Sequence, residues 1–211
     1  MALVKYNNNS ISAITAASSL TAGAMTLIKE QTASSSATIS FVNGTSDVVL
    51  SSTYPIYLFK FINLHPGTND VTLMNNFSVD SGSNYNVTKT TTAFYAEHYE
   101  DDSATNFTYY ALVDLAQSAN DHYLSGGVGA GNDDSFNGEL FLFNPSSTTF
   151  VKHFSSESNQ SYNNNNNEPR SINWRTAGYC NTTSAVNAVI FKFNSGNIDS
   201  GTIKLYGIKD S

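Results

Sequence analysis

The densest group of ionisable side chains lies at residues 97–102 (EHYEDD). On a β-strand, His98 and Glu100 would share a face, and an imidazole and a carboxylate could there supply two ligands to a metal ion. No second histidine lies at a spacing that would complete such a site. We therefore interpret this segment as the solvated end of a strand and predict no metal site.

Other motifs are equally incomplete. Residues 132–134 (NDD) offer oxygen ligands but lack the order of a calcium loop, and the glycines at 127, 129 and 131 neither follow a strand nor open a helix, as a phosphate cradle requires. Residues 178–181 (GYCN) contain the single cysteine, Cys180, without an identifiable base partner, and no Gly-x-Ser-x-Gly elbow exists. No pair of carboxylates stands out for glycoside cleavage. The sequence predicts no catalytic residue, no cofactor and a buried, unreactive Cys180.

A binding surface is the better-supported chemistry. The only tryptophan, Trp174, precedes Arg175 and follows an asparagine-rich stretch at 163–167, so its ring could stack on a sugar. A tryptophan buried in the core is the alternative. The residues predicted to bind a receptor are Tyr162, Asn163, Asn164, Asn165, Trp174 and Arg175.

Strand patterns recur along the chain and are separated by Gly, Asn and Ser. Alternating or continuous apolar runs predict strands at 24–31, 37–41, 54–64, 71–79, 90–99, 139–143, 149–154, 171–176, 188–193 and 202–208. Such a pattern is typical of an all-β fold, an antiparallel two-sheet sandwich of jelly-roll type with about eight to ten strands. One helical turn is expected near 109–117.

Three features refine this prediction. The run at 54–64 is apolar on both faces, which indicates a central strand covered on both sides. The turn at 144–147 (NPSS) predicts a hairpin. The polar stretches at 78–89, 125–138 and 155–170 are expected to be exposed loops.

Residues 1–23 differ from the rest of the chain. They are small and polar, with Ser10 as an N-cap and Ile11, Ile14 and Leu20 at roughly helical spacing. We expect an arm that docks the protein to a neighbour, while an edge element of the same domain is the alternative. The predicted organisation is thus an arm over 1–23 and a β-sandwich domain over 24–211.

The composition excludes several partners. Charged residues are 13% of the chain, the net charge is −7, and Lys and Arg number ten in all, so there is no basic stripe for nucleic acid or an anionic membrane. One cysteine permits no internal disulfide. Neither a secretory signal nor a membrane-spanning run is predicted.

Several strand and turn segments resemble the jelly-roll virion structural proteins, often described as tail-fibre-like, of tailed bacteriophages that infect marine bacteria and cyanobacteria. They are residues 28–34 (IKEQTAS), 57–66 (YLFKFINLHP), 85–92 (YNVTKTTT), 143–148 (FNPSST) and 201–208 (GTIKLYGI). The resemblance implies a virion component made in the bacterial cytoplasm. It carries over no catalytic residue.

We therefore expect a non-enzymatic bacteriophage structural protein, most readily a tail-fibre or adsorption component that presents polar loops to a host glycan or protein. A homo-oligomer, most readily a trimer, bound to other virion proteins is expected. The alternatives are a capsid decoration or head-fibre protein, a glycan depolymerase, and a stand-alone lectin-like module.

Overall fold

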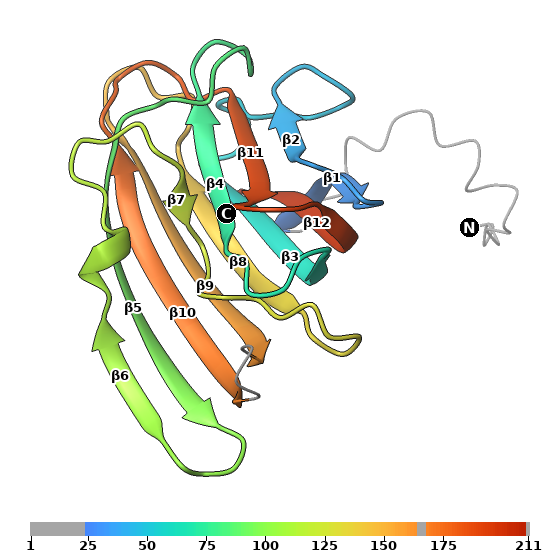
Figure 1. The fold of residues 1–211 in the computed structure, drawn as a ribbon. Helices are drawn as coiled ribbons and strands as arrows, with labels where there is room; N and C mark the ends of the chain where they lie inside the picture. The colour runs from blue at the N-terminus through green and yellow to red at the C-terminus, as the bar shows by residue number, and fades with distance from the viewer. Residues whose placement is uncertain (1–23, 164–167, 210–211) are drawn as a thin grey trace, which may run out of the picture.

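The computed structural model describes residues 24–163 and 168–209, which form two antiparallel sheets packed face to face (Figure 1). This arrangement confirms the prediction of an all-β, two-sheet sandwich. The strands of the large sheet, in spatial order, are β1 (Met25–Thr32), β12 (Ile198–Ile208), β3 (Ile56–Pro66), β8 (Phe136–Phe143), β9 (Lys152–Asn163), β10 (Pro169–Cys180), β5 (Lys89–Tyr99) and β6 (Thr105–Tyr109). Those of the small sheet are β2 (Ile39–Val42), β11 (Ala188–Phe193), β4 (Leu73–Ser78) and β7 (His122–Tyr123).

These twelve strands of the described residues exceed the eight to ten expected, partly because polar segments also form strands. Residues 155–163, predicted as part of a long loop, belong to β9, which pairs with β10 along its whole length. Its inward-facing residues include serines and a glutamine, so the segment shows no hydrophobic alternation. The predicted hairpin around 144–147 is confirmed, since β8 pairs with β9. The expected helical turn is a short 3-10 helix, η1 (Ala111–Val113).

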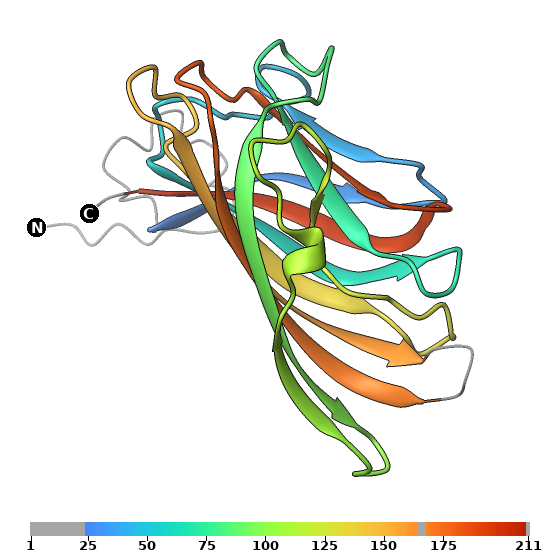
Figure 2. The ribbon, with the colours of Figure 1, turned by 60° about the vertical axis from the view of Figure 1, so that its left-hand side comes forward.

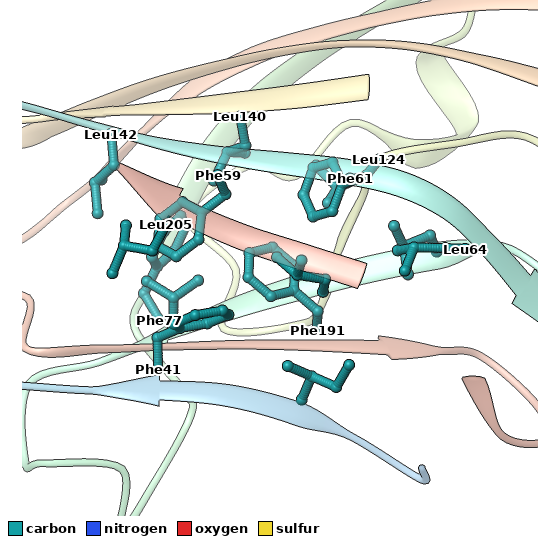
Figure 3. Close-up of a cluster of buried hydrophobic side chains, with 14 of the residues drawn as sticks. Phe41, Phe59, Phe61, Leu64, Phe77, Leu124, Leu140, Leu142, Phe191 and Leu205 are labelled. Carbon is teal, nitrogen blue, oxygen red and sulfur yellow. The ribbon is translucent and has the colours of Figure 1, made fainter. Parts of the chain in front are cut away.

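The core lies between the two sheets and is built mainly from phenylalanine, leucine and valine side chains (Figure 3). Phe191 of β11 meets Phe41, Phe59 and Phe61 edge to face, with ring centroids 5.1 to 6.3 Å apart. All four rings are at most 2% exposed. Edge-to-face packing suits the ring quadrupoles and adds to the gain from burying these large side chains.

Strand β3 differs from its prediction. It is central in the large sheet, between β12 and β8, but only its inner face packs against the small sheet. Phe59 and Phe61 point into the core, whereas Ile62 on the other face is 39% exposed. Leu58 on this outer face is only 3% exposed, but no second layer of the described residues lies there, so a sheet covers β3 on one side only and not on both as expected.

The large sheet extends beyond the small one. In Figures 1 and 2 the ends of β5, β6, β9 and β10 that lie away from the small sheet project past it. The inner face of these ends is therefore not part of the main core. It carries a second, smaller apolar cluster centred on Ala93, Ile172 and Trp174.

We predict that Phe191→Ala lowers the free energy of unfolding by about 3–5 kcal/mol, because it removes a ring that joins both sheets. Phe107→Ala is the matched control, since Phe107 is 75% exposed on β6 and its loss should change stability by only about 0.5 kcal/mol. Urea denaturation of both variants measures the difference, and equal stabilities would contradict this account of the core.

Candidate functional site

A pocket of about 320 Å³ lies on the inner face of β5, β9 and β10, where these strands extend past the small sheet. Strand register determines which side chains meet there, because residues opposite each other in antiparallel strands share a face. One row across β5 and β10 pairs Tyr95 with Trp174, and the row beside it pairs Glu97 with Ile172. The lining residues are Asp70, Thr72, Tyr95, Glu97, Tyr110, Val113, Tyr123, Ser125, Gly126, Gly127, Tyr162, Arg170, Ile172 and Trp174.

Trp174 forms the aromatic base of the pocket. Its ring is stacked on Tyr95 at 5.4 Å with an angle of 3° between the planes, and Tyr110 meets it edge-on at 5.5 Å. The side chain is only 3% exposed, and its Nε1 is buried without a hydrogen-bond partner. Trp174 therefore holds Tyr95 and Tyr110 in place, and those two half-buried tyrosines present the accessible ring surface.

Arg170 closes one end of the pocket between two aromatic rings. Its guanidinium carbon lies 4.7 Å from the ring centre of Tyr99 and 4.5 Å from that of Tyr162, within the range of a cation–π contact. Its Nε is 3.2 Å from Oε2 of Glu97, and Nη1 donates a hydrogen bond to the Tyr99 hydroxyl. Because β9, β10 and β5 each supply part of this cluster, the arginine is fixed in one orientation.

Tyr162 connects this cluster to the loop that precedes β4. Burial, followed by the charge of Asp70, raises the pKa of the Tyr162 hydroxyl, whereas Arg170 acts in the opposite direction. The phenol therefore stays protonated and can both donate and accept hydrogen bonds. Arg170 pairs with Glu97, and its Nη1 also lies 4.0 Å from Oε2 of Glu168. The charged residues that line the pocket, Asp70, Glu97 and Arg170, sum to −1.

Two glycines form the roof of the pocket. A Cβ added to Gly127 would lie 2.3 Å from Cε2 of Tyr162 and 2.3 Å from Oδ1 of Asp70. A Cβ on Gly126 would lie 3.5 Å from Cζ3 of Trp174. The start of the predicted loop at 125–138 thus packs closely on the aromatic rings, while its last three residues belong to β8. Only a residue without a side chain fits at position 127 without displacing the rings.

The predicted receptor-binding residues fall in different places. Tyr162 and Trp174 line the pocket, but Arg175, the next residue on β10, points to the opposite face, where its Nη2 is 2.5 Å from Oε1 of Glu157. Asn163 is the last residue of β9, and Asn164 and Asn165 lie outside the described residues. So do Ile11, Ile14 and Leu20 of the predicted arm.

Sequence reasoning missed the tyrosines and charges that complete the pocket. Tyr95, Glu97 and Tyr99 alternate along β5, and Arg170, Ile172 and Trp174 alternate along β10. This two-residue spacing was a usable signal, because it places each trio on one face of its strand. What could not be read was the register that brings the two trios together.

A second polar cluster lies between the small sheet and the large sheet. Nε2 of His122 is 2.6 Å from Oγ1 of Thr176, which in turn donates to the Thr92 carbonyl. Burial lowers the pKa of His122 to about 3, with a smaller contribution from the charge of Lys89. Nδ1 of the same ring lies 2.9 Å from Oδ1 of Asn75, so the neutral imidazole has one N–H for two oxygen partners, and the network connects β7 to β4, β10 and β5.

Lys89 and Cys180 lie opposite each other at the same end of the sheet. Burial lowers the pKa of Lys89 to about 8, although Nζ donates to Oδ1 of Asn76 and to the Val87 carbonyl. Burial likewise raises the pKa of Cys180 to about 12, so its thiol stays protonated and unreactive near neutral pH. This matches the buried Cys180 expected from the sequence.

The acidic segment at 97–102 is divided by the end of β5. Glu97 faces the pocket, while the exposed His98 lies on the other face with its Nε2 3.0 Å from Oδ1 of Asp102. Glu100 follows the strand in a turn. Within residues 24–163 and 168–209, no group of three or more His, Cys, Asp or Glu side chains could hold a metal ion. In the same part of the chain, no helix is long and apolar enough to cross a bilayer.

A larger, more open depression of about 660 Å³ lies beside β4 and residues 112–121. Its wall is mainly loop, and Nζ of Lys192 lies 2.9 Å from Oδ2 of Asp121 within it. The smaller pocket is the stronger candidate site, because aromatic rings, carboxylates and a guanidinium converge there on rigid strands.

Comparison with known proteins gave no match: no family model, no curated protein and no solved structure is significantly similar to this chain.

We predict that acid destabilises the protein partly through His122. The unfolded chain binds a proton at this residue below about pH 6.5, whereas the folded protein does so only near pH 3. The contribution of His122 to the free energy of unfolding is therefore fully present above pH 6.5. It falls as the pH drops, by at most about 1.4 kcal/mol per pH unit.

Urea denaturation of His122→Gln between pH 4.5 and 7.5 should give a flatter pH dependence than the wild type. His153→Gln, at an exposed site on the outer face, is the control and should keep the wild-type slope. An unchanged slope in His122→Gln would show that this histidine is not buried in its neutral form.

Proposed function

We propose that this chain is a non-enzymatic structural protein of a bacteriophage virion, an adsorption component whose pocket binds a neutral saccharide of the host surface. The observation that carries the binding part is the pocket built from Tyr95, Tyr110, Tyr162, Glu97 and Arg170. The virion part rests on the resemblance of strand and turn segments described above.

The chemistry of the pocket matches that of a sugar. A pyranose has a face of C–H groups that packs on aromatic rings and hydroxyls that both donate and accept hydrogen bonds. Glu97 and Asp70 accept from hydroxyls, Arg170 donates to them, and the tyrosine hydroxyls do both. A volume of about 320 Å³ suits a short saccharide at the lower limit of small-molecule sites.

The charge balance favours neutral over acidic sugars. Asp70 and Glu97 outnumber Arg170 among the lining residues, and the guanidinium is already paired with Glu97 at 3.2 Å. A carboxylated or sulfated sugar would have to displace that pair and would meet the repulsion of Asp70.

The same pairing supports a binding role over glycan cleavage. Glycoside hydrolysis needs two carboxyl groups placed on either side of the scissile bond and free to act on it. Here Glu97 is occupied by Arg170, and Asp70 interacts with the hydroxyl of Tyr162. Both carboxylates therefore hold the pocket in shape.

We predict that the full chain binds neutral oligosaccharides on a glycan array and that Tyr162→Ala weakens this binding at least tenfold, about 1.4 kcal/mol, when titrated by calorimetry. Tyr109→Ala is the matched control, because Tyr109 is 59% exposed on β6 and does not line the pocket. Binding that is absent in the wild type, or equal in both variants, would refute a sugar site here.

The virion role has its own test. Immunogold labelling of intact particles should place the protein on the tail, and purified protein should release no reducing sugar from host envelope material. Label on the capsid would instead identify a decoration or head-fibre protein. Sugar release by the wild type would identify a depolymerase.

A further inference from the structure

The outer face of the large sheet carries an apolar surface where a two-layer sandwich normally presents polar residues to water. Met25 and Leu27 at its edge are 47% and 49% exposed, and Phe143 is 37% exposed. Their exposure shows that no described segment covers them. This outer apolar surface comprises Met25 and Leu27 of β1, Tyr206 and Ile208 of β12, Ile56 of β3, and Phe141 and Phe143 of β8, and these side chains surround Leu58 of β3, which is only 3% exposed.

A single row of six charged residues borders this surface, one from each of six adjacent strands. The row contains three ion pairs, with N–O distances of 2.9, 4.0 and 2.5 Å, so it is neutral although the chain carries a net charge of −7. In strand order the row consists of Glu30 (β1), Lys204 (β12), Lys60 (β3), Glu139 (β8), Glu157 (β9) and Arg175 (β10).

The signs along this row, − + + − − +, reverse about its centre between β3 and β8. A two-fold axis placed there, parallel to the strands, would bring the same face of a second copy over the first with the strand order inverted. Every charge would then meet an opposite one. Lys60 would lie over Glu139 of the second copy, Lys204 over Glu157, and Glu30 over Arg175.

Neighbouring positions of the axis fail this test. An axis between β12 and β3 would place Lys204 over Lys60, and an axis between β8 and β9 would place Glu139 over Glu157. An axis through β3 would place Lys60 over Lys60 of the second copy, and an axis through β8 would place Glu139 over Glu139. Like charges directly opposed are unfavourable, and only the central axis pairs all six charged residues with opposite charges.

The shape of the surface favours the same axis. In the row next to the charges, β1 and β12 carry the bulky Leu27 and Tyr206, whereas β9 and β10 carry the small Ser155 and Ala177. A depression of about 260 Å³ lies over these small residues. The two-fold axis places Leu27 of the second copy over Ala177 and Tyr206 over Ser155, so each bulky edge enters the other copy's depression.

From this self-complementarity we infer that the protein forms a two-fold dimer through the outer face of its large sheet. Six strands at about 4.8 Å spacing and three rows of side chains cover on the order of 600 Å² per copy. The pair would bury about 1,200 Å², the lower end of stable specific interfaces. The dimer replaces the trimer expected from the sequence and does not depend on sugar binding.

Sedimentation velocity of the full chain at tens of micromolar tests this inference, and we expect a dimer that dissociates on dilution. Leu27→Asp and Ala177→Arg should each weaken the dimer at least tenfold. Ser171→Arg is the matched control, because it adds the same side chain to the outer face of β10 away from the apolar surface, and it should dimerise like the wild type.

A mixture of the two disruptive variants gives the sharpest result. In a mixed dimer one contact keeps the native Leu27 and Ala177, and the other pairs the new carboxylate with the new guanidinium. The mixture should therefore dimerise although neither variant does so alone. A wild-type monomer, a wild-type trimer, or a mixture that stays monomeric would overturn the proposed axis.

Discussion

The small sheet of this sandwich has half as many strands as the large one, and the rest of the structure depends on this mismatch. Four strands can bury the inner face of only part of an eight-stranded sheet. The remaining inner face must either be polar or form its own core. In this chain the ends of β5, β9 and β10 form a second apolar cluster, centred on Trp174 and roofed by η1 and residues 125–128.

That second cluster is too small to close completely, and the pocket results from this incomplete packing. Trp174 and Ile172 are buried, but the tyrosines around them keep one edge accessible. The side chains of the Arg170–Glu97 pair beside these tyrosines are only 15% and 9% exposed. A pair this buried loses much of its hydration, and the contacts of Arg170 with the Tyr99 and Tyr162 rings offset part of that cost.

The sequence was sufficient for the elements in which burial follows strand periodicity. β11 and β12 alternate between core and surface, and the turn between β8 and β9 has strong turn chemistry, so these were predicted correctly. The start of β9 is predicted as a strand, but its part beyond residue 154 is not, because Ser156, Ser158 and Gln160 face inward yet are polar. Backbone hydrogen bonds to β8 and β10 make this segment a strand, and the hydropathy of a sequence does not show which backbone segments pair.

The site was only partly predictable for a related reason. Residue type alone predicts Tyr162 and Trp174 as binding residues. Adjacent residues of a strand point to opposite faces of the sheet, so Arg175 lies on the other face from Trp174. The contacts of Arg170 with Glu97 and Tyr162 depend on the register of three strands. Register is set by packing of the whole sheet, so no local pattern encodes it.

The two faces of the large sheet differ in how their charges are placed, and this difference argues for separate roles. On the inner face, Arg170 lies between two aromatic rings and is paired with Glu97, an arrangement that suits a small polar ligand. On the outer face the charges form one neutral row beside apolar side chains, an arrangement that serves a flat protein surface. Because strand residues alternate between faces, β9 and β10 can contribute to both surfaces at once. Two copies joined through their outer faces would hold the two pockets on opposite sides of the dimer, so the dimer interface would leave both pockets accessible.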